Sequence, residues 1–156
     1  MQTIKGFTLI EMVIVMLVTS IVMISVSFMV SWGFTNYFTG VKATSLTNQA
    51  IIAMARISKE LQQASRFSAI TATSMTFTTT EGSTISYSWS TPTLTRTGAS
   101  SQTLNNQITS FSLAYYQSNF STTSTLTSIQ AVTIQMTLNN GNEIVALINT
   151  VFLNNM

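Results

Sequence analysis

Residues 5–30 read KGFTLIEMVIVMLVTSIVMISVSFMV, and this stretch decides the fold of the N-terminal part of the chain. From Phe7 to Val30 every residue is apolar or carries a small hydroxyl group, except for one carboxylate, Glu11. A helix over these residues is roughly 36 Å long, which is enough to cross the hydrocarbon core of a bilayer. The stretch therefore predicts a membrane-spanning helix over 7–30.

Two ordinary kinds of segment compete with this interpretation. A cleaved secretory signal has a shorter apolar region, of about 7–15 residues, followed by a small-residue cleavage site, and no A-x-A site ends this run. A plain signal anchor explains the length and the position of Lys5 on the cytoplasmic side, but it does not explain Glu11. A carboxylate costs about 2.5–3.5 kcal/mol at the middle of a bilayer and less near the interface, so Glu11 needs a cation at its own depth. Cleavage after Gly6 would create one, because Phe7 would then carry a new amine.

The stretch from Lys5 to Glu11, KGFTLIE, resembles the prepilin cleavage and methylation signal of type IV pilins and type II secretion pseudopilins. In that family a membrane peptidase cuts after the glycine, so the resemblance implies a leader over 1–6 that ends at Gly6. It also implies that the same enzyme methylates the amine of Phe7. Glu11 would meet the N-terminal amine of a neighbouring subunit during assembly. Lys5 is the basic residue of the leader and keeps it in the cytoplasm.

The apolar pattern changes in the second part of the predicted helix. From Leu46 onwards, apolar residues recur every three or four positions on one face, which predicts an amphipathic continuation over 31–66, with the helix ending near Ser65. Arg56 and Glu60 are four positions apart and are expected to pair on the solvated face. The expected core positions are Leu46, Ala50, Ala53, Met54, Ile57, Leu61 and Ala64.

Beyond residue 66 the apolar period falls to two, which predicts an antiparallel β-rich domain over 67–156. Two alternating runs around Glu81-Gly82 predict a β-hairpin. Further strands are expected over 111–115 and 132–138. The Asn-Gly dipeptide at 140–141 predicts a tight turn that returns the chain as a last strand.

Two stretches without a clear period, 91–107 and 118–128, are rich in Ser, Thr and Asn and are expected to be loops. Trp89 and Tyr115 keep the alternation of their strands and are expected in the core. Phe120 lies off that pattern, so core and contact surface are equally open for it.

Composition excludes several classes of function. The chain contains no His and no Cys, and its four acidic residues are widely separated, so we expect no metal site, no cofactor and no enzymatic activity. The basic residues are scattered and the net charge is only +2, so nucleic acid is not expected as a primary partner.

The expected fold class is therefore α+β and pilin-like: a long N-terminal helix, with a transmembrane first half and an amphipathic second half, packed on an antiparallel β-sheet domain. The resemblance implies a structural subunit of a type IV pilus or a type II secretion pseudopilus. Its expected partners are the prepilin peptidase, other pilin or pseudopilin subunits and the inner-membrane assembly platform. The run from Met54 to Ala64 resembles minor pilins of the J and W type, which implies a role at the filament tip or in starting assembly.

The expected location is the inner membrane, with a single span, a cytoplasmic N-terminus and a periplasmic C-terminal domain, followed by entry into the filament. A second hypothesis is a membrane-anchored binding or adhesin module that never polymerises. Such a module would need the anchor and the β-domain, but neither cleavage after Gly6 nor Glu11.

Overall fold

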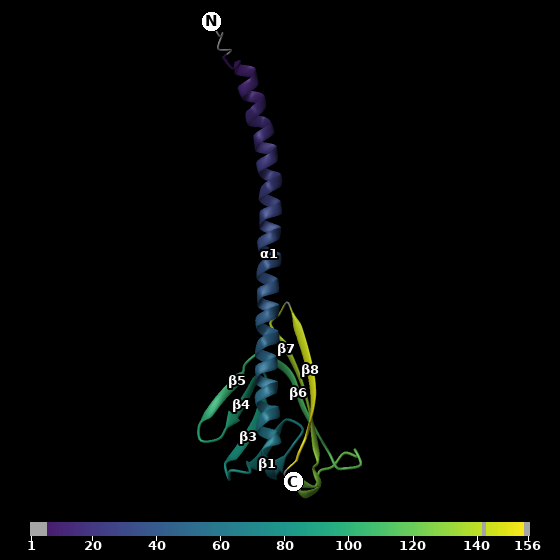
Figure 1. The fold of residues 1–156 in the computed structure, drawn as a ribbon. Coiled ribbons are helices and arrows are strands. Elements are labelled where there is room, and N and C mark those ends of the chain that lie inside the picture. The colour runs from purple at the N-terminus through teal and green to yellow at the C-terminus, as the bar shows by residue number, and fades with distance from the viewer. Residues whose placement is uncertain (1–5, 142, 155–156) are drawn as a thin grey trace. The chain divides into compact units, whose positions relative to one another are not determined.

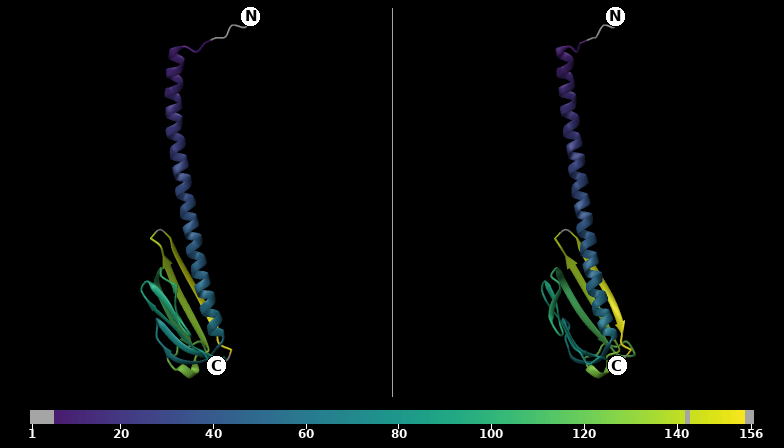
Figure 2. Two further views of the ribbon diagram at one scale, coloured as in Figure 1. Left: turned by 90° about the vertical axis from the view of Figure 1, so that its left-hand side faces the viewer. Right: turned by 60° about the vertical axis from the view of Figure 1, so that its left-hand side comes forward.

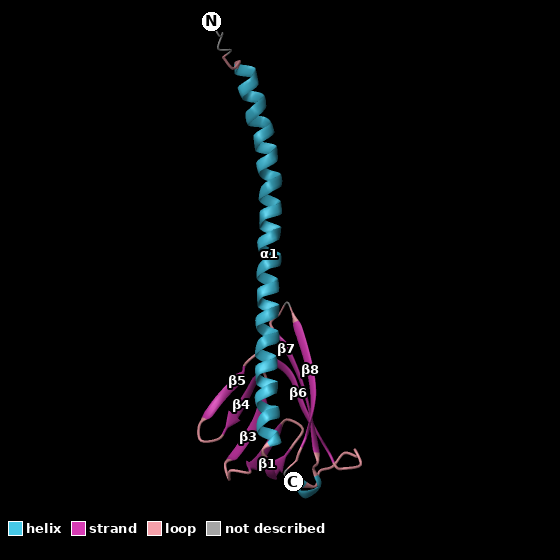
Figure 3. Cartoon of the chain, viewed as in Figure 1, coloured by secondary structure: helices cyan, strands magenta, loops and turns pink. Residues whose placement is uncertain are grey.

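The computed structural model describes residues 6–141 and 143–154. The chain forms two compact units that divide between Lys42 and Ala43, and we describe each unit by itself. One helix, α1 (Leu9–Gln62), contributes residues to both units (Figures 1 and 3). Two antiparallel sheets complete the second unit, so the fold class is α+β and pilin-like, as the sequence predicts.

In the first unit, the apolar side chains of α1 are exposed. Leu9 is 84% exposed and Trp32 is 73% exposed, and the residues of α1 that are buried all belong to the second unit. By length and composition, α1 contains a segment that is able to cross a membrane. A helix that is apolar on all sides is suited to lipid or to packing among other apolar helices.

The hydroxyl groups in this apolar segment are satisfied by the helix itself. Thr19 Oγ1 donates a hydrogen bond to the carbonyl of Val15 at 2.6 Å, and Ser20 Oγ donates to Met16 at 2.7 Å. Ser25 and Ser27 donate in the same way to the carbonyl four residues earlier. These bonds lower the cost of placing hydroxyl groups where no water is available.

In the second unit, α1 buries the predicted apolar stripe. Leu46, Ala50, Ala53, Met54, Ile57 and Leu61 are its buried residues. The helix ends at Gln62 rather than near Ser65, because the chain from Ala64 onwards pairs as a strand. Ala64 lies opposite Thr79 and Arg66 lies opposite Thr78 in this ladder, and such pairing outweighs helix propensity.

The first sheet contains five strands in the order of the chain. Its central hairpin matches the prediction, since Met75 lies opposite Tyr87 and Phe77 lies opposite Ile85. Gly82 in the connecting turn has φ of +85°, a conformation that glycine adopts without strain. The strands are β1 (Ala64–Ile70), β2 (Ser74–Thr79), β3 (Thr84–Ser90), β4 (Thr93–Thr97) and β5 (Ser101–Asn105).

The expected loop over 91–107 is wrong, because it contains the hairpin of β4 and β5. These two strands carry little apolar alternation. Leu94 is the one buried hydrophobic residue of β4, and the buried position of β5 is Asn105. Pairing with β3 holds β4 in place, with Trp89 opposite Leu94, and a sequence period cannot reveal that contact.

The second sheet has the order β6-β7-β8 (Figure 2). It consists of β6 (Ile108–Tyr116), β7 (Ala131–Asn139) and β8 (Ile144–Phe152), and a short 3-10 turn, η1 (Leu126–Ser128), precedes β7. The buried residues of both sheets and of the helix stripe form one core cluster. Tyr115 is in this core as predicted, with its OH donating to the carbonyl of Thr71 at 3.0 Å, whereas Trp89 is only partly buried at its edge.

The core position of the helix stripe can be tested with two isoleucines of α1. Ile57 is fully buried and Ile52 is 69% exposed. We expect Ile57→Ala to lower the free energy of unfolding by about 3 kcal/mol through lost burial and cavity formation. The matched change Ile52→Ala should cost less than about 0.5 kcal/mol. Chemical denaturation of the full chain in detergent measures both, and equal losses would contradict this packing.

Candidate functional site

The residues at the predicted cleavage joint precede the helix. Gly6, Phe7 and Thr8 have no regular secondary structure, and α1 begins at Leu9. A Cβ atom built on Gly6 would meet nothing within 4 Å, and Phe7 is 74% exposed. The peptide bond between Gly6 and Phe7 is therefore free of helical hydrogen bonds and open to another molecule. Lys5, the predicted basic residue of the leader, lies outside the described residues.

Thr8 caps the helix immediately after this joint. The backbone N–H of Glu11 donates a long hydrogen bond of 3.4 Å to Thr8 Oγ1, and the N–H of Met12 donates to the Thr8 carbonyl at 3.2 Å. Thr8 and Glu11 thus have the spacing of a capping box, in which Thr is the N-cap and Glu is the third helical residue. The apolar period does not predict this cap, although the T-x-x-E pattern at residues 8–11 is a sequence signal for it.

Glu11 itself stands in the first turn of α1 with its side chain exposed. The partial positive charge of the helix N-terminus favours a carboxylate at this position. Within residues 6–141 and 143–154 the ion pairs are Arg56–Glu60 and Arg96–Glu60, so Glu11 has no ion-pair partner among them. In an apolar environment this carboxylate would need a cation from elsewhere.

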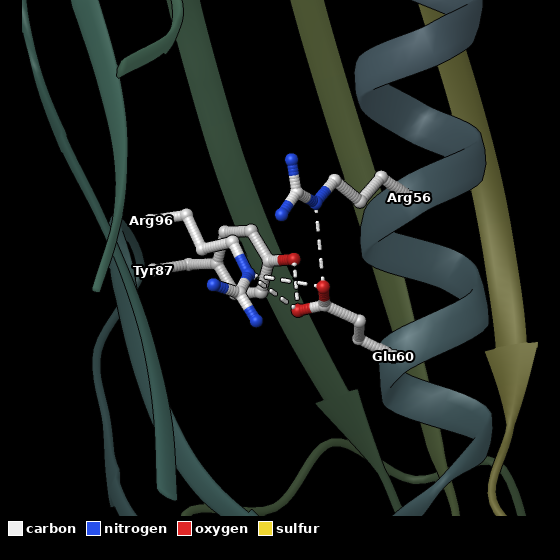
Figure 4. A network of polar contacts seen from close by, with 4 residues as sticks. All are labelled: Arg56, Glu60, Tyr87 and Arg96. Atoms are coloured by element: carbon white, nitrogen blue, oxygen red, sulfur yellow. Dashed lines mark hydrogen bonds and ion pairs between the residues drawn. The ribbon is translucent and has the colours of Figure 1, made fainter. Parts of the chain in front are cut away.

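A second polar site lies in the other unit, around Glu60 of α1 (Figure 4). Arg96 Nε donates to both carboxylate oxygens of Glu60 at 2.9 Å, and the OH of Tyr87 donates to Oε2 at 2.6 Å. Arg56 Nε donates to Oε1 at 3.3 Å. Tyr87 and Arg96 face Glu60 together because they lie opposite each other in the register of β3 and β4.

This network corrects the prediction that Glu60 belongs to a solvated face. The Arg56–Glu60 pair forms as predicted, but the Glu60 side chain is only 15% exposed, as is that of Arg96. Arg56 is the more open partner, with 40% of its side chain exposed. The helix period gives no information about partners on distant strands, so it does not predict that this carboxylate is covered.

The environment shifts the acid–base behaviour of the network. Burial raises the pKa of the Glu60 carboxyl, but hydrogen bonds from Arg96 and Tyr87, the charge of Arg96 and the bond from Arg56 lower it more, so that the pKa lies below its usual value of 4.5. Burial and the bond to Glu60 raise the pKa of the Tyr87 phenol, which therefore remains a donor. The bond to Glu60 also raises the pKa of Arg96.

The chemistry of this network indicates a structural role. One carboxylate accepts bonds from two guanidinium groups and one neutral phenol, which leaves no free base or nucleophile among the four side chains. The part of the chain that the structure describes contains no group of three or more His, Cys, Asp or Glu residues able to hold a metal ion. The network joins the helix to the hairpin of β3 and β4.

Comparison with known proteins identifies the N-terminal part of the chain. Residues 1–27 match the family model described as the prokaryotic N-terminal methylation motif. A search of curated proteins finds no match. The chain therefore carries a type IV pilin-like prepilin signal, which continues directly into the exposed apolar part of α1.

The Glu60 network leads to a pH-dependent prediction. Because the pKa of Glu60 is lowered from 4.5 in the folded protein, its charge stabilises the fold fully above about pH 5. This contribution is lost as the pH falls through the folded-state value. Glu60→Gln should lower the free energy of unfolding at pH 7 by about 2 kcal/mol and flatten its dependence on pH below 5.

The control for this experiment is Glu81→Gln, which removes an exposed carboxyl in the turn between β2 and β3. Its unfolding curves in detergent should match those of the original chain over pH 3–7 within about 0.5 kcal/mol. An acid dependence that stays the same in Glu60→Gln would show that the carboxylate does not tie the helix to the hairpin.

Proposed function

We propose that this protein is a membrane-anchored structural subunit of a type IV pilus or a type II secretion pseudopilus. The observation that carries the proposal is the prepilin-type signal at residues 1–27, joined without interruption to an apolar helix of membrane-spanning length. A signal that is read by a processing enzyme and a helix suited to lipid or to other helices are the two requirements for such a subunit.

The first step of the proposal is processing by a prepilin peptidase. The enzyme cuts between Gly6 and Phe7 and methylates the new amine of Phe7. The exposure of both residues and their position ahead of the Thr8 cap support this step, because a protease needs an extended and accessible backbone. Lys5 holds the leader on the cytoplasmic side, and the β-rich unit stands on the periplasmic side of the inner membrane.

The second step is assembly with other subunits on the inner-membrane platform. The carboxylate of Glu11 pairs with the methylated amine of Phe7 on a neighbouring subunit. This pairing supplies the cation that Glu11 lacks within the described residues, and it sets the axial register between two apolar helices. The β-rich unit then faces outward and determines which neighbour fits.

The position of the subunit in the filament is the most specific part of the proposal. The likeness of the Met54–Ala64 run to J- and W-type minor pilins supports a minor subunit at the tip or in the initiation of assembly. The alternative, an anchored binding module that never polymerises, shares the helix and the β-domain but needs no processing.

Processing is tested by mass spectrometry of the mature protein from its native host. We expect an N-terminus at Phe7 that carries one added methyl group. A Gly6→Leu variant should accumulate at full length, because a branched side chain prevents close approach of the protease to the scissile bond. An intact Met1 on the protein in the mature filament fraction would contradict the proposal and favour the anchored module.

The role of Glu11 is tested by its neutral isostere. Glu11→Gln should leave membrane insertion unchanged, because it removes a charge that is costly in lipid. It should reduce recovery of the subunit in sheared filaments by about tenfold, the effect of losing an interaction of about 1.4 kcal/mol. Glu81→Gln, which removes a carboxylate from the other unit, serves as the control. Equal recovery of all three proteins would remove the role assigned to Glu11.

A further inference from the structure

Strand β8 (Ile144–Phe152) is an edge of the three-stranded sheet, and no other described strand pairs with its outer side. It pairs with β7 on one side, and its pairing register continues from Ile144 to Phe152 without a bulge. Its sequence, IVALINTVF, contains no charged residue and no proline. Natural edge strands usually carry a charged residue, a proline or a bulge, because these features prevent the addition of another strand. This edge lacks these forms of protection.

The register shows which backbone groups of β8 face outward. The N–H of Leu153 donates to the Gln130 carbonyl at 2.9 Å, and the N–H of Asn140 donates to the Glu143 carbonyl at 3.3 Å. In an antiparallel ladder, bonded pairs alternate with non-bonded pairs, so odd-numbered residues of β8 bond to β7. The N–H and C=O groups that point to the open edge belong to Ile144, Ala146, Ile148, Thr150 and Phe152.

The same even-numbered residues expose apolar side chains on the outer face of the sheet. Ile144 and Ile148 are each 68% exposed, and Phe152 is 55% exposed. The ring of Phe120, itself 66% exposed, meets the ring of Phe152 edge to face at 6.1 Å between centroids. An apolar strip therefore follows the outer face of the edge strand and ends on Phe120.

The loop around Phe120 holds that ring in place. Phe120 has φ of +60°, which is unfavourable for a bulky residue. Its N–H donates to the Gln117 carbonyl at 2.9 Å, and the Gln117 side chain donates to Ser121 Oγ at 2.7 Å. The N–H of Ser121 also donates to Asn119 Oδ1 at 3.0 Å. These bonds offset the backbone strain and keep an aromatic ring exposed at the end of the strip.

A groove between β8 and α1 borders the other side of the edge. Its apolar lining residues include Ile51, Ala55 and Leu147, together with Ile148 of the outer strip. Asn149 Nδ2 donates to Ser58 Oγ at 2.8 Å and ties the strand to the helix there. Ile51 is 50% exposed, so the apolar lining of the groove is accessible to another molecule.

We propose that β8 receives an extended, uncharged strand from a partner protein, with apolar side chains on both of its faces. Open backbone donors and acceptors at the edge would bind such a strand by β-addition, and the outer strip and the inner groove would accept its alternating side chains. A helix or a lipid surface would leave the backbone groups of the edge unpaired. A charged strand would bury charges against β8 with no partner.

The proposed occupant is a different chain rather than a second copy paired through the same strand. Two copies joined by antiparallel β8 strands would be related by a two-fold axis across the sheet. Their α1 segments over 43–62, which lie beside β8, would then run in opposite directions. Subunits of one filament, as in the proposed function, share a single orientation and are joined by head-to-tail contacts, so this two-fold pairing does not occur within it. The addition of a strand to β8 is itself independent of cleavage and methylation.

The test uses a labelled peptide with the sequence IVALINTVF and a solubilising tail, added to the full chain in detergent. We expect saturable binding by fluorescence anisotropy. A second peptide with lysine at its third and fifth positions should bind about tenfold more weakly or not at all. Hydrogen exchange should show new protection at the amides of Ile144, Ala146 and Ile148.

Two variants of the chain localise the binding. Ala146→Pro removes an outward N–H without breaking a bond to β7, and Ile148→Lys places a charge on the outer strip. Each should weaken peptide binding by about tenfold or more, which corresponds to a lost hydrogen bond or a buried charge. Gln135→Lys is the matched control, since Gln135 lies opposite Ile148 on β7 and is exposed. Unfolding curves verify that each variant folds.

Three results would overturn the inference. The first is absence of peptide binding, and the second is binding that Ile148→Lys and Gln135→Lys affect equally. The third is dimerisation of the chain without peptide, with protection of the same amides of β8, which would assign the edge to a second copy.

Discussion

Burial of a single helical stripe is the constraint on which the second unit depends. The segment of α1 from Leu46 to Leu61 carries an apolar stripe on one side only. Exposure of this stripe to water would be unfavourable, so the helix needs other elements to cover it. Both sheets contribute side chains to the same core as this stripe. The two sheets have separate strand orders, and the helix is the element that gives them a common apolar face. The same helix shows no burial at its N-terminal part, so its two parts are suited to two different environments.

The Glu60 network fixes the orientation of the helix within this apolar packing. Hydrophobic contact is tolerant of small rotations of a helix, whereas a carboxylate held by Arg96 at 2.9 Å and Tyr87 at 2.6 Å is specific for one position. The side chains of Glu60 and Arg96 are each only 15% exposed, so their bonds are stronger than those of an ordinary surface pair. It also connects the hairpin of β3 and β4, which has few buried apolar residues in β4, to the helix. We infer that it orients the five-stranded sheet on α1.

Glu11 and strand β8 each carry polar groups for which we propose a partner from another chain. At the N-terminal end, Glu11 is placed by the Thr8 cap but has no ion-pair partner in the described residues. Near the C-terminal end, β8 leaves one row of backbone donors and acceptors open between two apolar faces. A free carboxylate in an apolar helix is completed by a cation, and an open edge is completed by a strand. Both proposals therefore describe a protein that completes its bonding in an assembly.

The sequence alone determined the features that depend on local pattern and residue type. The apolar run, the KGFTLIE signal, the helical stripe and the alternating strands β2, β3, β6 and β7 are all readable from spacing, because each reflects the period of its own element. Only the tertiary structure decided the distant partners of Glu60, Tyr87 and Arg96, which lie 27 and 36 positions further along the chain. It also decided that 91–107 forms strands and that β8 is left at an edge. Those outcomes depend on which distant segments pair, and pairing is set by the packing of the whole unit rather than by the period of any one segment.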